Sequence, residues 1–171
     1  MPGYDLAIAD ESGDALEGEA TGELIVRGDS ALDRYWNHPD RTAECLRDGL
    51  FYTRDRYRRD ADGRYWYEGR ADDMFKVSGL WVSPAEVEAA LIEHPAVFEC
   101  AVVGVAVEGF VKAKAFVVRR EPGGDAEALA DELRSFSATK LHRYEVPQFF
   151  AFVDDLPKTL TGKIQRFKLR D

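Results

Sequence analysis

The chain is poor in the residues that build disulfide frameworks and metal sites. Its 171 residues include two cysteines and three histidines. Cys45 and Cys100 stand alone, without Cys-x-x-Cys spacing, so we expect two buried thiols in a cytoplasmic protein. The histidines share no metal-ligand spacing, so we expect structural roles for them and no metal site in the chain: His38, His94 and His142.

Long apolar runs and an excess of positive charge are missing as well. No apolar stretch approaches the ~20 residues of a membrane helix, so we expect no membrane partner. Residues 1–5 lack the charged and apolar regions of a signal peptide, and we expect no leader. The net charge of −9 has the wrong sign for a general nucleic-acid-binding protein. With 45% hydrophobic and 32% charged residues, the composition suits a globular fold.

The first seventy residues are predicted to be mainly β-structure. Short runs of alternating or β-branched residues are separated by glycine- and aspartate-rich turns, which is typical of hairpins. The expected strands are residues 5–9, 22–28, 51–57 and 64–69, with a turn at 60–63 and a short helix at 38–47.

The remainder of the chain favours a compact α+β domain with the order β-α-β-β-α-β. A helix is expected to begin at Ser83-Pro84, which pairs a serine N-cap with proline in the first turn, and to end at His94-Pro95. Further elements are expected at residues 97–106, 111–118, 126–139 (a helix) and 148–153. The composition shift near residue 70 divides the chain into a β-rich part, residues 1–70, and a C-terminal domain, residues 71–171.

The C-terminal segment gathers positive charge on an otherwise acidic chain. Residues 158–171 hold five cations and one acid, and Gly162 allows a sharp turn directly before Lys163. A basic tip suits a phosphate or carboxylate target, because a lysine ammonium acts as a mobile point charge. A solvated basic terminus is the alternative. The segment is not a P-loop, because the spaced glycine and the Ser/Thr after the lysine are missing.

Residues 157–166, Pro-Lys-Thr-Leu-Thr-Gly-Lys-Ile-Gln-Arg, resemble the C-terminal lysine motif of the adenylate-forming acyl- and aryl-CoA ligases. The resemblance implies that Lys163 contacts the carboxylate substrate and the α-phosphate. Residues 69–79 resemble the Gly-Arg-x-Asp-Asp hinge motif of the same superfamily. The resemblance implies that Arg70 binds the nucleotide and that Asp72 is the pivot about which the C-terminal domain rotates between two half-reactions. A charged interdomain linker is the alternative.

Other positions resemble less specific motifs of the same family, and these resemblances imply further roles. Thr53-Arg54-Asp55 resembles the Thr-Gly-Asp segment, which implies that Asp55 holds the ribose hydroxyls of ATP. This chain has Arg54 where the family usually has glycine, and an exposed strand aspartate is the alternative. The resemblance also implies that Gly79 lies against the pantetheine tunnel and that Lys76 serves the second half-reaction.

The segment from Val77 to Glu88, with Trp81, is similar to the benzoate–CoA ligase branch. Nothing in the chain corresponds to the family's phosphate loop, its Mg²⁺-linked glutamate or its acyl pocket. We therefore expect a C-terminal fragment of an ATP-dependent carboxylic acid–CoA ligase, acting on benzoate or another aryl acid and inactive alone. The implied ligands are ATP or AMP, coenzyme A as co-substrate, and Mg²⁺ held by residues outside this chain.

The expected partners are the missing N-terminal domain and a small aryl or acyl carboxylate, with no nucleic acid. Exposed strand edges within residues 1–70 would also allow a homodimer. A second hypothesis is a non-catalytic module that binds a nucleotide, CoA or a partner enzyme through the same surface. A third is regulatory, since acylation of Lys163 would remove its charge.

Overall fold

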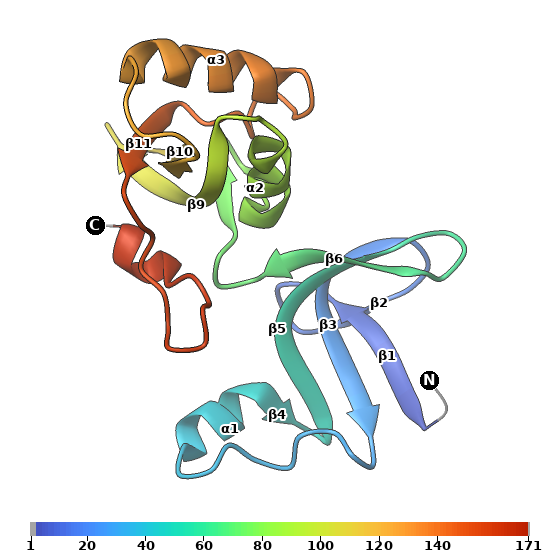
Figure 1. Ribbon diagram of the computed structural model, residues 1–171. Coiled ribbons are helices and arrows are strands. Elements are labelled where there is room, and N and C mark those ends of the chain that lie inside the picture. Colours follow the sequence, from blue (N-terminus) through green and yellow to red (C-terminus); the bar gives the residue numbers. More distant parts are fainter. Residues whose placement is uncertain (1–2, 171) are drawn as a thin grey trace. The chain divides into compact units, whose positions relative to one another are not determined.

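The computed structural model describes residues 3–170 and separates into two compact units, Met1–Asp72 and Asp73–Asp171 (Figure 1). The first unit is mainly β-structure, and the second combines a three-stranded sheet with two longer helices. The predicted α+β class is therefore confirmed. No helix among residues 3–170 is long and apolar enough to cross a membrane.

The first unit is built on one antiparallel sheet with the strand order β2-β1-β3-β5-β4, to which β6 adds by pairing with β5. All four predicted strands are confirmed, and the two-residue strands β2 and β4 were not predicted. The predicted helix at 38–47 is shorter, because the chain enters β4 directly after it. The elements are β1 (Tyr4–Ala9), β2 (Ala15–Leu16), β3 (Ala20–Gly28), α1 (Pro39–Cys45), β4 (Leu46–Arg47), β5 (Leu50–Arg59) and β6 (Tyr65–Arg70).

Close packing of β3 on β1 depends on a glycine. A Cβ atom on Gly22 would lie 2.0 Å from the carbonyl oxygen of Ala9 and 2.9 Å from the side chain of Ile8. Ile8 and Ala9 are both fully buried. The glycine is therefore required by the approach of two backbones, and a side chain there would push the strands apart.

The second unit contains a three-stranded sheet, β11-β10-β9, in which β10 runs antiparallel to β9 and parallel to β11. The predicted order β-α-β-β-α-β is confirmed, with a hairpin of two short strands in the place of its first strand. The single-turn helix η1 was not predicted. The elements are β7 (Phe75–Val77), β8 (Leu80–Val82), α2 (Pro84–Ile92), β9 (Val97–Val107), β10 (Phe110–Arg119), α3 (Ala126–Ala138), β11 (Phe149–Val153) and η1 (Arg166–Leu169).

Both longer helices begin at side-chain caps. The Ser83 hydroxyl accepts a hydrogen bond from the Glu86 amide at 3.4 Å, and the Asp125 carboxylate accepts from Glu127 at 2.9 Å. The helices pack against each other and over the sheet, and their apolar faces close one core. Its fully buried members are Val82, Val87, Leu91, Val97, Val102, Ala115, Val117 and Leu133. Burial of each larger side chain contributes roughly 1.5–3 kcal/mol.

Candidate functional site

A bulge in β5 shapes the part of the first unit that carries Asp55. Glu23 pairs with Arg56 and Ile25 pairs with Tyr52, so residues 53–55 oppose a single residue of β3. Two hydrogen bonds hold the extra residues in place. The Thr53 hydroxyl donates to the carbonyl of Leu24 at 2.8 Å, and the Arg54 amide donates to the Glu23 carboxylate at 2.7 Å. Such bulges re-aim individual side chains.

Arg54 occupies the left-handed backbone region that glycine adopts freely, with a φ of 59°. An arginine in this conformation costs roughly 1 kcal/mol. The position where the family resemblance expects glycine therefore keeps a glycine-like backbone here, despite the larger residue. The Arg54 guanidinium points toward two carboxylates, Glu44 and Asp72, each at 3.6 Å.

Asp55 and Arg70 are brought together across the β5–β6 pair, where their Cα atoms are direct partners. Arg70 Nη1 donates to Asp55 Oδ1 at 2.9 Å and to the carbonyl of Thr53 at 3.3 Å. Burial lowers the pKa of Arg70, but the charges of Asp55 and Asp72 outweigh that effect and raise it. Asp55 Oδ2 has no hydrogen bond to any residue between 3 and 170. The carboxylate thus keeps one acceptor oxygen for a ligand.

Lys76 and Gly79 lie on one short hairpin in the second unit. Val77 pairs with Leu80, which leaves a two-residue turn in which Ser78 and Gly79 both have positive φ, 52° and 84°. This is the pattern of a type I′ turn. Lys76 Nζ lies 4.4 Å from the centroid of the Trp81 ring. A Cβ atom on Gly79 would meet no atom within 4 Å, so the turn, and no packing contact within the unit, accounts for this glycine.

Lys163 lies in a tight exposed loop, residues 158–164, which we call the Lys163 loop. Its ends are joined by a bridge between Lys158 and Ile164. Inside it, the Thr159 amide donates to the carbonyl of Lys163 at 2.8 Å, and Gly162 turns the chain with a φ of 82°. The Lys163 side chain is exposed and makes no hydrogen bond or ion pair within the described part of the chain. Its backbone is therefore ordered while its ammonium group stays available.

The N-terminal end of the Lys163 loop, at Lys158, is fixed to the sheet by an ion pair. Lys158 Nζ lies 2.7 Å from the Glu99 carboxylate on β9 and 3.0 Å from Asp155. The hydrogen bonds to these two carboxylates raise the pKa of Lys158, and the bond to Glu99 has the larger effect. The loop base is also closed by the Gln165 amide, which donates to the carbonyl of Pro157 at 2.7 Å.

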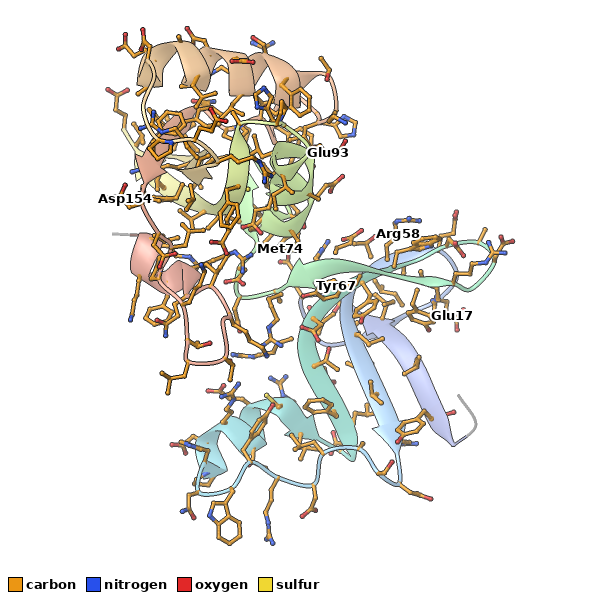
Figure 2. The ribbon with its side chains drawn as sticks, viewed as in Figure 1. Glu17, Arg58, Tyr67, Met74, Glu93 and Asp154 are labelled. Carbon is orange, nitrogen blue, oxygen red and sulfur yellow. The ribbon has the colours of Figure 1, made fainter. Side chains whose placement is uncertain are left out.

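The C-terminal end of the Lys163 loop is fixed by a charged group of four side chains, which we call the anchor cluster: Asp73, Glu88, Arg166 and Arg170. Arg166 holds Glu88 with two hydrogen bonds, of 3.0 and 2.6 Å. Its third nitrogen donates to Asp73 at 3.2 Å, and Arg170 donates to the other oxygen of Asp73 at 3.3 Å. Met74, labelled in Figure 2, follows Asp73 and leads into β7.

Asp73 and Arg166 stand within the two family-like motifs but had no predicted role, and no role was predicted for Glu88. One signal was available. Glu88 stands beside Val87 and three residues before Leu91, on the apolar face of α2, where a glutamate needs a buried partner. Burial raises the pKa of Glu88, and the bonds from Arg166 offset part of that rise.

The structure groups the predicted site residues by unit. Asp55, Arg70 and Asp72 lie in the first unit, where Arg70 contacts the other two. Lys76, Gly79 and Lys163 lie in the second. Their nucleotide, hinge and CoA roles remain predictions. No group of three or more acidic, histidine or cysteine side chains suited to a metal ion occurs within residues 3–170.

Comparison with known proteins finds similar sequences and structures. Residues 86–163 match the AMP-binding enzyme C-terminal domain. The benzoate–CoA ligase of Thauera aromatica is 47% identical over 99% of this chain, which covers 33% of that protein. A benzoate CoA ligase structure from Burkholderia xenovorans LB400 is 45% identical, with a TM-score of 0.85, 99% of this chain covered and 34% of the other.

An anthranilate CoA ligase in complex with anthranoyl-AMP gives a similar result. It is 41% identical with a TM-score of 0.88, over 98% of this chain and 33% of that one. The chain thus spans about a third of the length of the relatives that it matches.

Proposed function

We propose that this chain is the C-terminal part of an ATP-dependent carboxylic acid–CoA ligase of the AMP-binding enzyme family. The proposal rests on the match of residues 86–163 to the AMP-binding enzyme C-terminal domain and on the similarity to benzoate–CoA ligase. Residues 1–70 would be the β-rich end of the N-terminal domain, and residues 71–171 the mobile C-terminal domain. The division into two compact units at Asp72 and Asp73 supports this assignment.

The proposed reaction has two steps. A carboxylate oxygen attacks the α-phosphorus of ATP, and pyrophosphate leaves. The thiolate of CoA then attacks the carbonyl carbon of the acyl-adenylate, and AMP leaves. Lys163 stabilises the charge that develops on the α-phosphate and orients the carboxylate in the first step, which is a positioned-charge role.

The observation that carries this proposal is the Lys163 loop itself. Its backbone is held at both ends, by Lys158 and by Arg166, while the Lys163 ammonium has no partner inside the described part of the chain. A structural lysine would pair with a neighbouring carboxylate. A lysine that must enter an anionic site elsewhere needs this combination of an ordered backbone and an available charge.

The first unit fits a ribose. Asp55 has a side chain 30% exposed and one acceptor oxygen left over after it binds Arg70. A carboxylate suits a cis-diol because it accepts from both hydroxyls. We propose that Asp55 and Arg70 bind the ribose and phosphate of the nucleotide. Mg²⁺ would be held by residues of the N-terminal domain.

The second half-reaction is assigned to the hairpin. We propose that the C-terminal domain rotates about Asp72, after which Gly79 lies along the pantetheine arm of CoA and Lys76 assists thioester formation. The turn accounts for the glycine, and because no atom lies within 4 Å of a Cβ built there, the backbone at Gly79 is open to a ligand from outside the unit.

We propose an aryl acid of the benzoate type as substrate, since benzoate- and anthranilate-CoA ligases are among the similar proteins. The other partner is the N-terminal domain of the same enzyme. A cytoplasmic location is supported by two free buried thiols, Cys45 and Cys100. A homodimer through exposed strand edges in the first unit remains part of the proposal.

The test uses the chain joined to the rest of the ligase. Lys163→Ala should lower adenylation ~10²–10³-fold, measured by ATP–pyrophosphate exchange, and spare thioester formation from preformed acyl-adenylate. Lys140→Met, which breaks the Lys140–Glu93 pair of 2.6 Å in the same unit, is the matched control. Equal losses in both half-reactions would contradict the role of Lys163.

The non-catalytic alternative is separated by a second experiment. The 171-residue chain should show no pyrophosphate exchange alone and should restore ligase activity when a separately expressed N-terminal domain is added. Tight binding of AMP or CoA by the chain alone, with no restored activity, would favour the binding module.

A further inference from the structure

Two consecutive aspartates are tied to arginines of different units. Asp72 Oδ1 lies 3.6 Å from Arg54, and its other oxygen lies 3.7 Å from Arg70, within the first unit. Asp73 binds Arg166 at 3.2 Å and Arg170 at 3.3 Å, within the second unit. The side-chain contacts therefore change from one unit to the other across a single peptide bond.

The contacts of Asp73 are better protected than those of Asp72. The side chain of Asp73 is 26% exposed and that of Arg166 is 20% exposed, whereas Asp72 is 56% exposed. Less exposed, charge-assisted hydrogen bonds are stronger and less screened by salt. We therefore expect Asp73 to stay fixed to its unit while Asp72 exchanges partners easily.

Arg166 connects Asp73 to the Lys163 loop. It follows the loop by two residues, and it binds Glu88 with two nitrogens while donating to Asp73 with the third. A planar guanidinium held at all three nitrogens has little freedom to rotate. The start of the second unit is thus joined to the segment that carries Lys163, although 93 residues separate them in sequence.

We propose, on the basis of the ligase function above, that Asp73 is a positioning residue for Lys163. Its carboxylate holds the first residue of the second unit to Arg166 and Arg170. Bending of the backbone between the units is then confined to the preceding residue, Asp72. Lys163 then stands at a defined place relative to the joint. Without these contacts, several residues after Asp72 would also flex. The Lys163 ammonium would then reach the carboxylate and the α-phosphate less often in an orientation that permits reaction.

The first test needs no ligase activity and uses the 171-residue chain. Asp73→Asn removes the charge and turns one acceptor oxygen into an NH₂ group that faces an arginine. Backbone amide hydrogen exchange in residues 156–167, measured by mass spectrometry, should become about tenfold faster. The amides that report are those of Thr159, Gly162 and Gln165, which are hydrogen-bonded within the loop.

Arg170→Met provides a second variant, which decides the question if Asp73→Asn does not fold. It removes one of the two arginines from Asp73 and should accelerate the same amides to a smaller extent. Lys140→Met is the control and should leave them unchanged, because the Lys140–Glu93 pair lies outside the anchor cluster. Unchanged exchange in Asp73→Asn and Arg170→Met would overturn the proposal, and so would equal acceleration throughout α3.

The second test uses the complete enzyme. Asp73→Asn should lower the kcat of adenylation about tenfold and leave the KM for ATP unchanged, since Asp73 does not touch substrate. Added to Lys163→Ala, it should cause no further loss, because it acts through that lysine. A further tenfold loss in the double variant would show that Asp73 acts independently and would overturn the proposal. If Lys163→Ala alone were fully active, the assigned role of Lys163 would fall, and the exchange result would still stand.

Discussion

Replacing Arg166 by methionine tests how a buried charge is held in the second unit. The substitution keeps most of the aliphatic length but removes both hydrogen bonds to Glu88, of 3.0 and 2.6 Å. Within residues 3–170, the Glu88 carboxylate is then left with one hydrogen bond, from the Val102 amide at 2.8 Å. Because its side chain is only 11% exposed, water cannot replace the lost donors well.

The expected loss of stability is about 3 kcal/mol at pH 7. A carboxylate that becomes too costly to bury takes up a proton instead, which limits the penalty. Protonating a carboxyl group whose ordinary pKa is 4.5 costs about 3.4 kcal/mol at pH 7, at about 1.36 kcal/mol per pKa unit. This limit agrees with the ~3–5 kcal/mol typical of a broken buried pair.

The assay is urea unfolding of the 171-residue chain followed by circular dichroism at 222 nm. Helices α2 and α3, of 9 and 13 residues, dominate that signal, and both belong to the second unit. The urea midpoint should fall by roughly 1–2 M, whereas Lys140→Met should change stability by less than about 1 kcal/mol. An unchanged midpoint and slope in Arg166→Met would refute the reasoning.

The same variant should also respond to pH with a predictable sign. In Arg166→Met the folded-state pKa of Glu88 lies further above its unfolded value, so the folded state binds the proton more tightly. Stability is then lost as pH rises from the unfolded-state pKa through the folded-state pKa of Glu88, and it is regained as pH falls toward 5. A deficit that grew on acidification would contradict this assignment of the buried charge.

Three further changes test local packing and backbone strain. Gly22→Ala should destabilise the first unit by about 2–3 kcal/mol in thermal unfolding, because its Cβ would lie 2.0 Å from the Ala9 carbonyl oxygen. Arg54→Gly should be more stable than Arg54→Ala by roughly 1 kcal/mol, since only glycine relieves the φ of 59°; equal stabilities would contradict it. Burial raises the pKa of the Cys100 thiol to about 12, so in a Cys45→Ser background a disulfide reagent at pH 8 should react only after unfolding.

Much of the fold was predictable because its signals are local. The caps at Ser83 and Asp125 and the apolar stripes behind them define α2 and α3 from neighbouring residues alone. The turns at 60–63 and 108–109 likewise define two hairpins. The parallel pairing of β11 with β10 depends on a long connection through α3, and no short pattern predicts it.

Candidate site residues can be identified from the sequence where a motif is continuous, whereas contacts between distant residues are hidden. Lys163 stands in a recognisable segment, and the structure adds that its ammonium has no partner in the described chain. The contact of Asp73 with Arg166 joins positions 93 apart, so no spacing in the sequence announces it. The bulge around Arg54 depends on Glu23 in another strand, and the sequence alone left open whether arginine fits there.

The anchor cluster raises the question of why a charged pair is buried where apolar residues would pack. Because burial raises the pKa of Glu88 despite Arg166, the pair contributes little net stability, and its loss as a pair should be tolerated. Glu88→Gln/Arg166→Met keeps an acceptor for the Val102 amide and removes both charges. It should unfold nearer the wild-type urea midpoint than Arg166→Met alone, yet hydrogen exchange in residues 156–167 should still be faster, because an apolar contact does not fix direction as two hydrogen bonds do. A double variant with restored stability and wild-type exchange would mean that packing alone orders the Lys163 loop.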